Sequence, residues 1–149
     1  MNAIIKPLAL AIGVSLLSLS ACSQPVKSTL EASRQAEQGD AVAAVLIFAE
    51  WCPSCKVLDP KVEAARGSED WNGVSFVLLD FTDKNSDRLF AAADAAGVGP
   101  AIRKELARGV RTGQLILVDL DDQVAVDRLT KDLSVEAISE RIKTALQAL

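Results

Sequence analysis

Residues 48–56 read FAEWCPSCK, in which two residues separate Cys52 from Cys55. The apolar run that leads into them, AVAAVLIFA at residues 41–49, has the length and the Val, Ile and Phe content of a strand buried on both faces. After the cysteines, apolar residues recur at helical spacing up to Gly67, namely Val57, Leu58, Val62 and Ala65. The pair is therefore predicted to lie where a buried strand gives way to a helix.

Two prolines fall within this predicted helix. Pro53 fits the first turn, where the N–H that proline lacks would have no intrahelical partner. Pro60 lies well inside the helix and is expected to kink it.

The remainder of the chain alternates between runs typical of strands and runs typical of helices. Further strands are predicted over residues 74–81, 114–119 and 123–128. Further helices are predicted over residues 30–38, 86–96 and 100–108, and from the N-cap Ser134 onward, where Val135, Ile138, Ile142, Leu146 and Leu149 form an apolar stripe. From residue 41 on, this order predicts an α/β fold with a central mixed β-sheet of about four strands flanked by helices on both faces.

The N-terminus resembles a bacterial lipoprotein signal. Lys6 precedes an uncharged apolar run that suits a signal peptide but is short for a membrane span. Residues 19–22, LSAC, resemble the lipobox, in which the cysteine is lipidated and becomes the first mature residue. We therefore predict a lipoprotein signal peptide at residues 1–21, a lipidated tether at 22–29 and one folded domain at 30–149.

Lipidation of Cys22 has two consequences. It removes this residue from disulfide chemistry and leaves Cys52 and Cys55 as the remaining pair. It also predicts a protein of the bacterial cell envelope that faces the periplasm and is anchored, at the inner or outer membrane, by acyl chains. The alternative is an ordinary cleaved signal with Cys22 left as a free thiol.

The charge of the chain excludes some partners. The 149 residues carry a formal net charge of −4 at pH 7, and Lys6 is the only charged residue of the predicted signal peptide. The mature chain is therefore more acidic, and it has no run of Lys or Arg. This balance argues against binding to nucleic acid and against electrostatic attachment to anionic lipid.

Three chemistries are open to Cys52 and Cys55. A structural zinc site needs four ligands, but the chain has no histidine and no second cysteine pair. An inert disulfide suits an oxidising compartment, but a bridge across two residues closes a small loop and stabilises the fold little. A redox couple is favoured, because a thiolate at a helix N-terminus is stabilised by the free N–H groups and the helix dipole.

The position of each cysteine predicts its role. Cys52 is nearer the helix end and follows the exposed-looking Glu50–Trp51, so we expect it to be the nucleophile. Cys55 lies one turn into the helix, so we expect it to resolve the mixed disulfide. Lys56 adds a positive charge, and Ser54 can supply a donor to the attacking sulfur.

Residues 49–56, AEWCPSCK, with Pro60 beyond them, resemble the active-site segment of the thioredoxin superfamily. The predicted element order resembles the thioredoxin fold over residues 30–149, and LLDFTDKNSD at residues 78–87 resembles a stretch of periplasmic and membrane-linked thioredoxin-like domains. The resemblance implies a thiol–disulfide oxidoreductase without cofactor or metal. Its implied site residues are Cys52 and Cys55, supported by Trp51, Pro53, Ser54 and Lys56.

One departure from the family pattern concerns proton transfer. Leu46 stands where the family carries a buried aspartate that moves protons to and from the resolving cysteine. The nearby carboxylates Glu50 and Asp59 are not obvious substitutes. A local base for Cys55 is therefore missing from the expected place.

Two further departures concern the loop opposite the cysteines. Thr112 and Gly113 stand where the family has a cis-proline, so we expect a trans peptide and a more mobile substrate loop. The predicted helix at residues 100–108 leads into this loop. We expect the helix to shape the substrate groove; the alternative is a surface insertion.

The resemblance implies reduction of protein disulfides, and together with the predicted lipoprotein signal it predicts a monomer that acts in the bacterial periplasm and receives electrons from a membrane partner. Two alternatives remain open. One is a non-catalytic thioredoxin-fold module that binds proteins, and the other is a metal-handling protein, for example for copper, because a thiolate pair suits soft ions.

Overall fold

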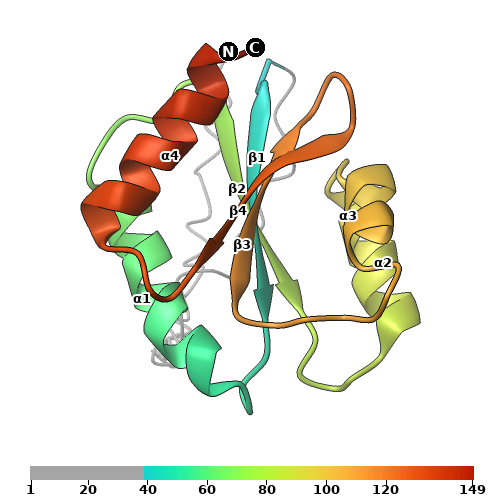
Figure 1. Ribbon diagram of the computed structural model, residues 1–149. Coiled ribbons are helices and arrows are strands. Elements are labelled where there is room, and N and C mark those ends of the chain that lie inside the picture. Colours follow the sequence, from blue (N-terminus) through green and yellow to red (C-terminus); the bar gives the residue numbers. More distant parts are fainter. Residues whose placement is uncertain (1–38) are drawn as a thin grey trace, which may run out of the picture.

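The structure is a computed structural model that describes residues 39–149 (Figure 1). The predicted signal peptide, the lipidated tether and the predicted helix at 30–38 lie outside the described residues. The strands are β1 (Val42–Phe48), β2 (Val74–Asp80), β3 (Gln114–Asp119) and β4 (Val124–Thr130). The helices are α1 (Pro53–Gly67), α2 (Ser86–Ala95), α3 (Gly99–Glu105) and α4 (Val135–Gln147).

The four strands form one mixed sheet in the order β2-β1-β3-β4. Strand β1 pairs in parallel with β2 and antiparallel with β3, and β3 pairs antiparallel with β4. The predicted element order and the mixed four-stranded sheet are therefore confirmed. Boundaries differ by one to three residues: β4 runs to Thr130 and not to residue 128, and α3 ends at Glu105 although the apolar pattern continues to the buried Leu106.

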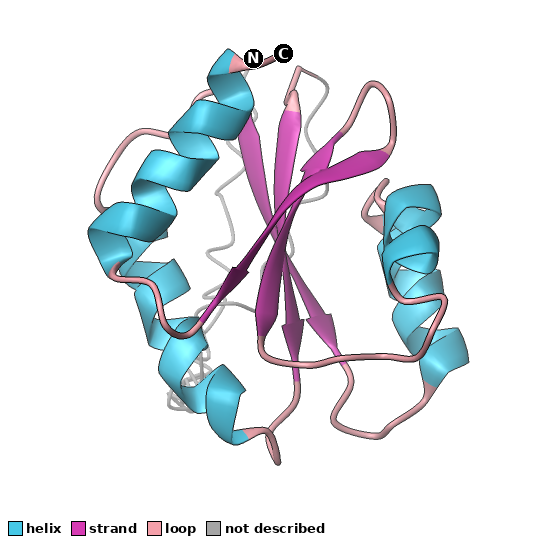
Figure 2. Cartoon of the chain, viewed as in Figure 1, coloured by secondary structure: helices cyan, strands magenta, loops and turns pink. Residues whose placement is uncertain are grey.

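Helices cover both faces of the sheet, as Figures 1 and 2 show, with α1 and α4 on one face and α2 and α3 on the other. Successive side chains of a strand point to opposite faces, and β1 follows this rule along its whole length. Its residues Val42, Ala44 and Leu46 pack in a core with α1 and α4. Its residues Ala43, Val45 and Ile47 pack in a second core with α2 and α3. Burial on both faces explains why β1 is a continuous apolar run.

Two predicted core positions lie outside this core. Val57 of α1 is 44% exposed, because the buried stripe of this helix is formed by Cys55, Leu58, Val62 and Ala65. Leu149, the last residue of the predicted stripe of α4, is 54% exposed and follows the end of the helix. None of the helices within residues 39–149 is long and apolar enough to cross a membrane.

Three loops meet at one end of the sheet, the lower end in Figure 1. Phe48 at the end of β1 is in register with Asp80 at the end of β2, and Ile47 is in register with Gln114 at the start of β3. The loop that enters α1, the loop that leaves β2 and the loop that leads from α3 into β3 therefore converge. The cysteine pair lies at this end.

Candidate active site

The junction of β1 and α1 holds Cys52 at the N-cap of the helix. Its backbone is extended, and its sulfur accepts a hydrogen bond from the backbone N–H of Cys55 at 3.3 Å. The backbone N–H of Cys52 in turn donates to the carbonyl of Ala49 at 3.0 Å. Pro53 follows in the first helical turn, as predicted, where its missing N–H leaves no intrahelical bond unmade.

The surroundings of Cys52 favour its thiolate. Burial opposes ionisation, since only 5% of the residue is exposed, but hydrogen bonds to the sulfur outweigh it and lower the pKa of the thiol below its ordinary value. The donors are the thiol of Cys55, the hydroxyl of Thr112 and the backbone N–H groups of Cys55 and Ser54. Ser54 therefore supplies a donor, and it does so through its backbone.

Cys55 has the opposite character. It is fully buried, and burial, together with the neighbouring Cys52 sulfur, raises its pKa to about 11. Its sulfur lies 3.7 Å from the carbonyl oxygen of Ile47, which is thus a second acceptor for the one S–H hydrogen that can also face Cys52. At neutral pH Cys55 is a protonated thiol beside a more acidic one, and no disulfide joins the two cysteines.

The loop of Thr112 and Gly113 closes over the pair. The backbone N–H of Gly113 donates at 2.8 Å to the same Ile47 carbonyl that accepts the Cys55 thiol. A Cβ atom on Gly113 would lie 2.6 Å from Cβ of Ser54 and 3.3 Å from Sγ of Cys52. With its φ of +77°, Gly113 is thus required both by the backbone conformation and by the close approach of the loop to α1.

The described residues contain no cis peptide bond, which confirms the expected trans peptide at Gly113. The expected mobility of the loop stays a prediction. Helix α3, which precedes the loop, contributes Ala101 and Ile102 to the core on the far face of the sheet. It is therefore a packed element and not a surface insertion, and its influence on a substrate groove stays a prediction.

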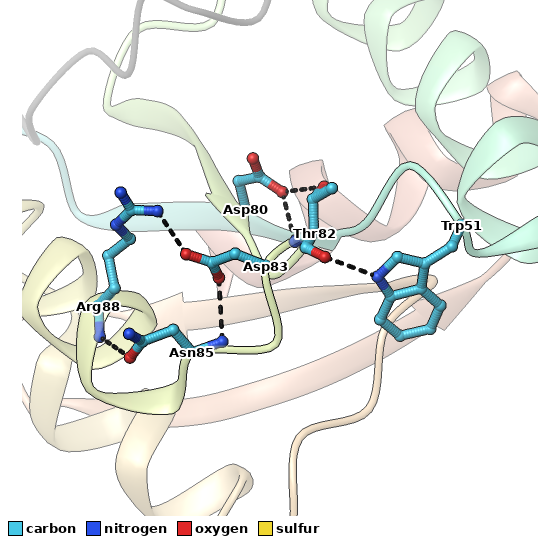
Figure 3. A network of polar contacts seen from close by, with 6 residues as sticks. All are labelled: Trp51, Asp80, Thr82, Asp83, Asn85 and Arg88. Atoms are coloured by element: carbon cyan, nitrogen blue, oxygen red, sulfur yellow. Dashed lines mark hydrogen bonds and ion pairs between the residues drawn. The ribbon is translucent and has the colours of Figure 1, made fainter.

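Trp51 is held against the loop that follows β2, as Figure 3 shows. Its indole N–H donates to the carbonyl of Thr82 at 2.9 Å, and the Thr82 hydroxyl accepts from the backbone N–H of Glu50 at 3.0 Å. The ring also makes an edge contact with Phe81 and lies under the ammonium group of Lys84, 5.1 Å away. Although it is fixed in this way, Trp51 remains 47% exposed beside Cys52.

The turn that holds Trp51 is ordered by its own short polar side chains. Asp80 accepts from the backbone N–H and the hydroxyl of Thr82, and Asp83 accepts from the backbone N–H of Asn85 and from Arg88 (Figure 3). Asn85 caps α2 by accepting from the backbone N–H of Arg88. The spacing of Asp, Thr and Asn in residues 80–85 is the signal in the sequence that could have revealed this turn.

Two of the residues singled out in the sequence have different surroundings from those expected. Lys56 is exposed and is not among the groups that lower the pKa of Cys52. Hydrogen-bond donors, and not the expected positive charge, therefore stabilise the Cys52 thiolate. Leu46 is buried in β1 between Leu78 and Leu115, which are its partners in the sheet. The site of the missing aspartate is therefore filled by apolar packing.

A mixed sheet in the order β2-β1-β3-β4, with paired helices on each face and a CxxC pair at the first turn after β1, is a thioredoxin-like fold. The resemblance to the thioredoxin superfamily is therefore confirmed at the level of the fold.

Comparisons with known proteins return thioredoxins and thioredoxin-like proteins among the solved structures. The chain is similar to Trxlp from Edwardsiella tarda at 22% identity and a TM-score of 0.47, over 72% of this chain and 85% of that one. It is similar to a mutant thioredoxin from Halobacterium salinarum at 22% identity and a TM-score of 0.47, over 80% and 86%. It is similar to StoA from Bacillus subtilis at 14% identity and a TM-score of 0.47, over 68% and 81%. No family model matches the sequence, and no curated protein matches it.

Proposed function

We propose that this protein is a thiol–disulfide oxidoreductase that reduces disulfides of protein substrates through Cys52 and Cys55. The observation that carries the proposal is the difference between two neighbouring thiols. Cys52, at the N-cap of α1, has a lowered pKa and is the less buried of the two, whereas the pKa of Cys55 is raised to about 11 in full burial. An attacking thiol and a resolving thiol need this division of properties.

The reaction proceeds in two exchanges. The thiolate of Cys52 attacks one sulfur of the substrate disulfide, forms a mixed disulfide and releases the first substrate thiolate. The sulfur of Cys55, after losing its proton, attacks Sγ of Cys52, and the second substrate thiolate leaves. Two electrons pass from the dithiol to the substrate, and the enzyme ends with a Cys52–Cys55 disulfide.

The surface around Cys52 supports a polypeptide as the substrate. Large apolar side chains with substantial exposure are few within the described residues, and Trp51 and Val57 are two of them. They precede and follow Cys52 in the chain at the entry to α1. Exposed apolar side chains in the segment that carries the reactive sulfur suit an unfolded or extended chain better than a small polar disulfide.

The location of this activity is also part of the proposal. The N-terminal sequence motivates a lipid anchor at Cys22 and a domain that faces the bacterial periplasm, where a membrane partner would return electrons to the oxidised pair. Labelling with a palmitate analogue tests the anchor: the label is expected on the wild-type protein and not on a Cys22→Ser variant.

Trapping of the mixed disulfide tests the proposed reaction. A Cys55→Ser variant, mixed with a disulfide-bonded model protein such as insulin, is expected to accumulate a covalent complex on a non-reducing gel. The Cys52→Ser/Cys55→Ser double variant is the matched control and should form none. If the Cys55→Ser variant forms no covalent complex with insulin, the proposal is contradicted and a non-catalytic binding module is favoured.

A further inference from the structure

Deprotonation of Cys55 is the step for which the site described above offers no proton acceptor. The thiol donates to the backbone carbonyl of Ile47, which orients it but does not take up a proton. With a pKa of about 11, the thiol stays protonated at neutral pH, and the attacking species must be the thiolate. Leu46 places an apolar side chain in the neighbouring part of β1.

Asp59 lies one helical turn beyond Cys55 in α1. Residues four apart on a helix share one side of it, with Cβ atoms about 5–6 Å apart. A helical side chain also leans towards the turn that precedes it, which at position 59 is the turn that holds Cys55. Helix geometry therefore places Asp59 on the side of α1 that holds the buried thiol.

The carboxyl group of Asp59 lacks an evident structural partner. Its Oδ1 is buried and has no hydrogen-bond partner among residues 39–149. Burial also raises the pKa of this carboxyl above its ordinary value, which makes it a better proton acceptor. A buried unpaired carboxylate oxygen is unfavourable for folding, so its presence one turn from a reacting thiol calls for a reason.

Glu63, one turn further along the same side of α1, provides the comparison. Its Oε1 is likewise buried without a hydrogen-bond partner in the described part of the chain. Burial raises the pKa of Glu63; the charge of Arg66 opposes this rise, and the charge of Asp59 adds to it. Glu63 however pairs with Arg66 at 3.3 Å, and it lies two turns from Cys55. Glu63 thus has a cationic partner, whereas burial is what shifts the pKa of Asp59.

Several other charged groups near α1 have partners of their own or are exposed to solvent. The ammonium group of Lys61 donates to the carbonyls of Lys131 and Leu133, and Lys56 is exposed. Strand β1 has no titratable side chain, and Asp119 of β3 pairs with Val42 at the far end of the sheet. On α4, which packs against α1, Lys143 pairs with Glu69 and Arg141 pairs with Asp127.

We propose that Asp59 accepts the proton of Cys55 when Cys55 attacks the mixed disulfide, and returns it when the dithiol is regenerated. The proposal rests on the proposed function, because it assigns a residue to its second exchange. The S–H bond of Cys55 breaks, and its proton moves to the Asp59 carboxylate. The S–S bond between Cys55 and Cys52 then forms, while the bond between Cys52 and the substrate sulfur breaks and the substrate thiolate leaves. The carboxyl group that the thioredoxin pattern places at position 46 is thus supplied from α1.

A chromogenic aromatic disulfide, mixed in equal amount with the reduced protein in a stopped-flow instrument, separates the two exchanges. The first released thiolate reports the attack by Cys52, and the second reports the attack by Cys55. The rates of both phases are measured from pH 5 to pH 10 for the wild type, Asp59→Asn, Asp59→Glu and the matched control Glu63→Gln.

In Asp59→Asn the second phase is expected to slow by about tenfold or more at pH 7. The difference should shrink towards pH 10, where hydroxide removes the proton instead. The first phase should stay within about twofold of wild type, which also shows that the variant is folded, and Asp59→Glu should recover much of the second phase. Glu63→Gln should leave the first phase nearly unchanged and should slow the second phase far less than Asp59→Asn does, because the carboxylate of Asp59 is kept.

A second phase that is unchanged in Asp59→Asn, slowed equally at every pH, or slowed equally by Glu63→Gln would overturn the role of Asp59. These outcomes leave the proposed function intact, because the wild type would still show both phases. A wild type without a first phase would instead refute the proposed function itself.

Discussion

Cys52 and Cys55 are three positions apart, but the pKa values of their thiols shift in opposite directions. Hydrogen bonding and burial cause this difference. The sulfur of Cys52 receives N–H and hydroxyl donors, whereas Cys55 is fully buried and donates to a backbone carbonyl. Spacing alone predicts which cysteine lies nearer the helix end. It does not predict Thr112 as a donor, because that contact depends on where a loop more than fifty residues away returns to the site.

Removal of the Thr112 hydroxyl tests this division at the scale of one residue. Thr112→Val should raise the pKa of Cys52, because a donor to its thiolate is lost. Alkylation of the reduced protein by iodoacetamide at pH 7 should therefore slow severalfold, and the midpoint of its pH profile should move upward. Thr130→Val, at the end of β4, is the control and should leave the profile in place. An unchanged midpoint in Thr112→Val would show that the hydroxyl does not support the thiolate.

At the scale of elements, three loops from separate parts of the chain build the site on the β1–α1 junction. The sequence predicts β1, β3 and α1 well, because their apolar patterns are set by burial. It assigns Val57 wrongly to the buried side, since helical spacing near the start of α1 allows two adjacent stripes. It also misses Thr82, whose backbone carbonyl holds Trp51 and leaves no mark on the side-chain pattern.

The approach of the Gly113 loop to α1 can be tested with two glycines of similar conformation. Gly113 has a φ of +77° and Gly97 a φ of +74°, but a Cβ at Gly97 would meet nothing within 4 Å. Gly97→Ala should therefore lower the free energy of unfolding by about 1–2 kcal/mol, from backbone strain alone. Gly113→Ala should lower it by a further amount of about 1–3 kcal/mol and speed alkylation of Cys52, because the loop must move away.

Urea unfolding of both reduced variants gives the comparison. Equal losses of stability in the two variants, with Cys52 alkylated at the wild-type rate, would mean that the loop does not press against Ser54 and Cys52 as the structure shows.

At the scale of the whole molecule, the sheet order and the paired helices are those of a thioredoxin-like fold, and the sequence predicts them because element order constrains topology strongly. Of the three departures from the family pattern, two are single residues at the site, Leu46 and Gly113. Glycine at position 113 lets the loop approach Cys52 closely. For the missing aspartate at position 46, we propose that Asp59 of α1 supplies the carboxyl group.

The reduction potential of the Cys52–Cys55 pair is the most direct test of the claim that this pair is a redox couple. Stabilisation of the Cys52 thiolate favours the dithiol and should keep the disulfide easily reducible. Equilibration in redox buffers, followed by alkylation and mass measurement, should show one two-electron transition between roughly −270 and −120 mV. A transition below about −300 mV, where structural disulfides lie, would contradict the account and indicate an inert bridge.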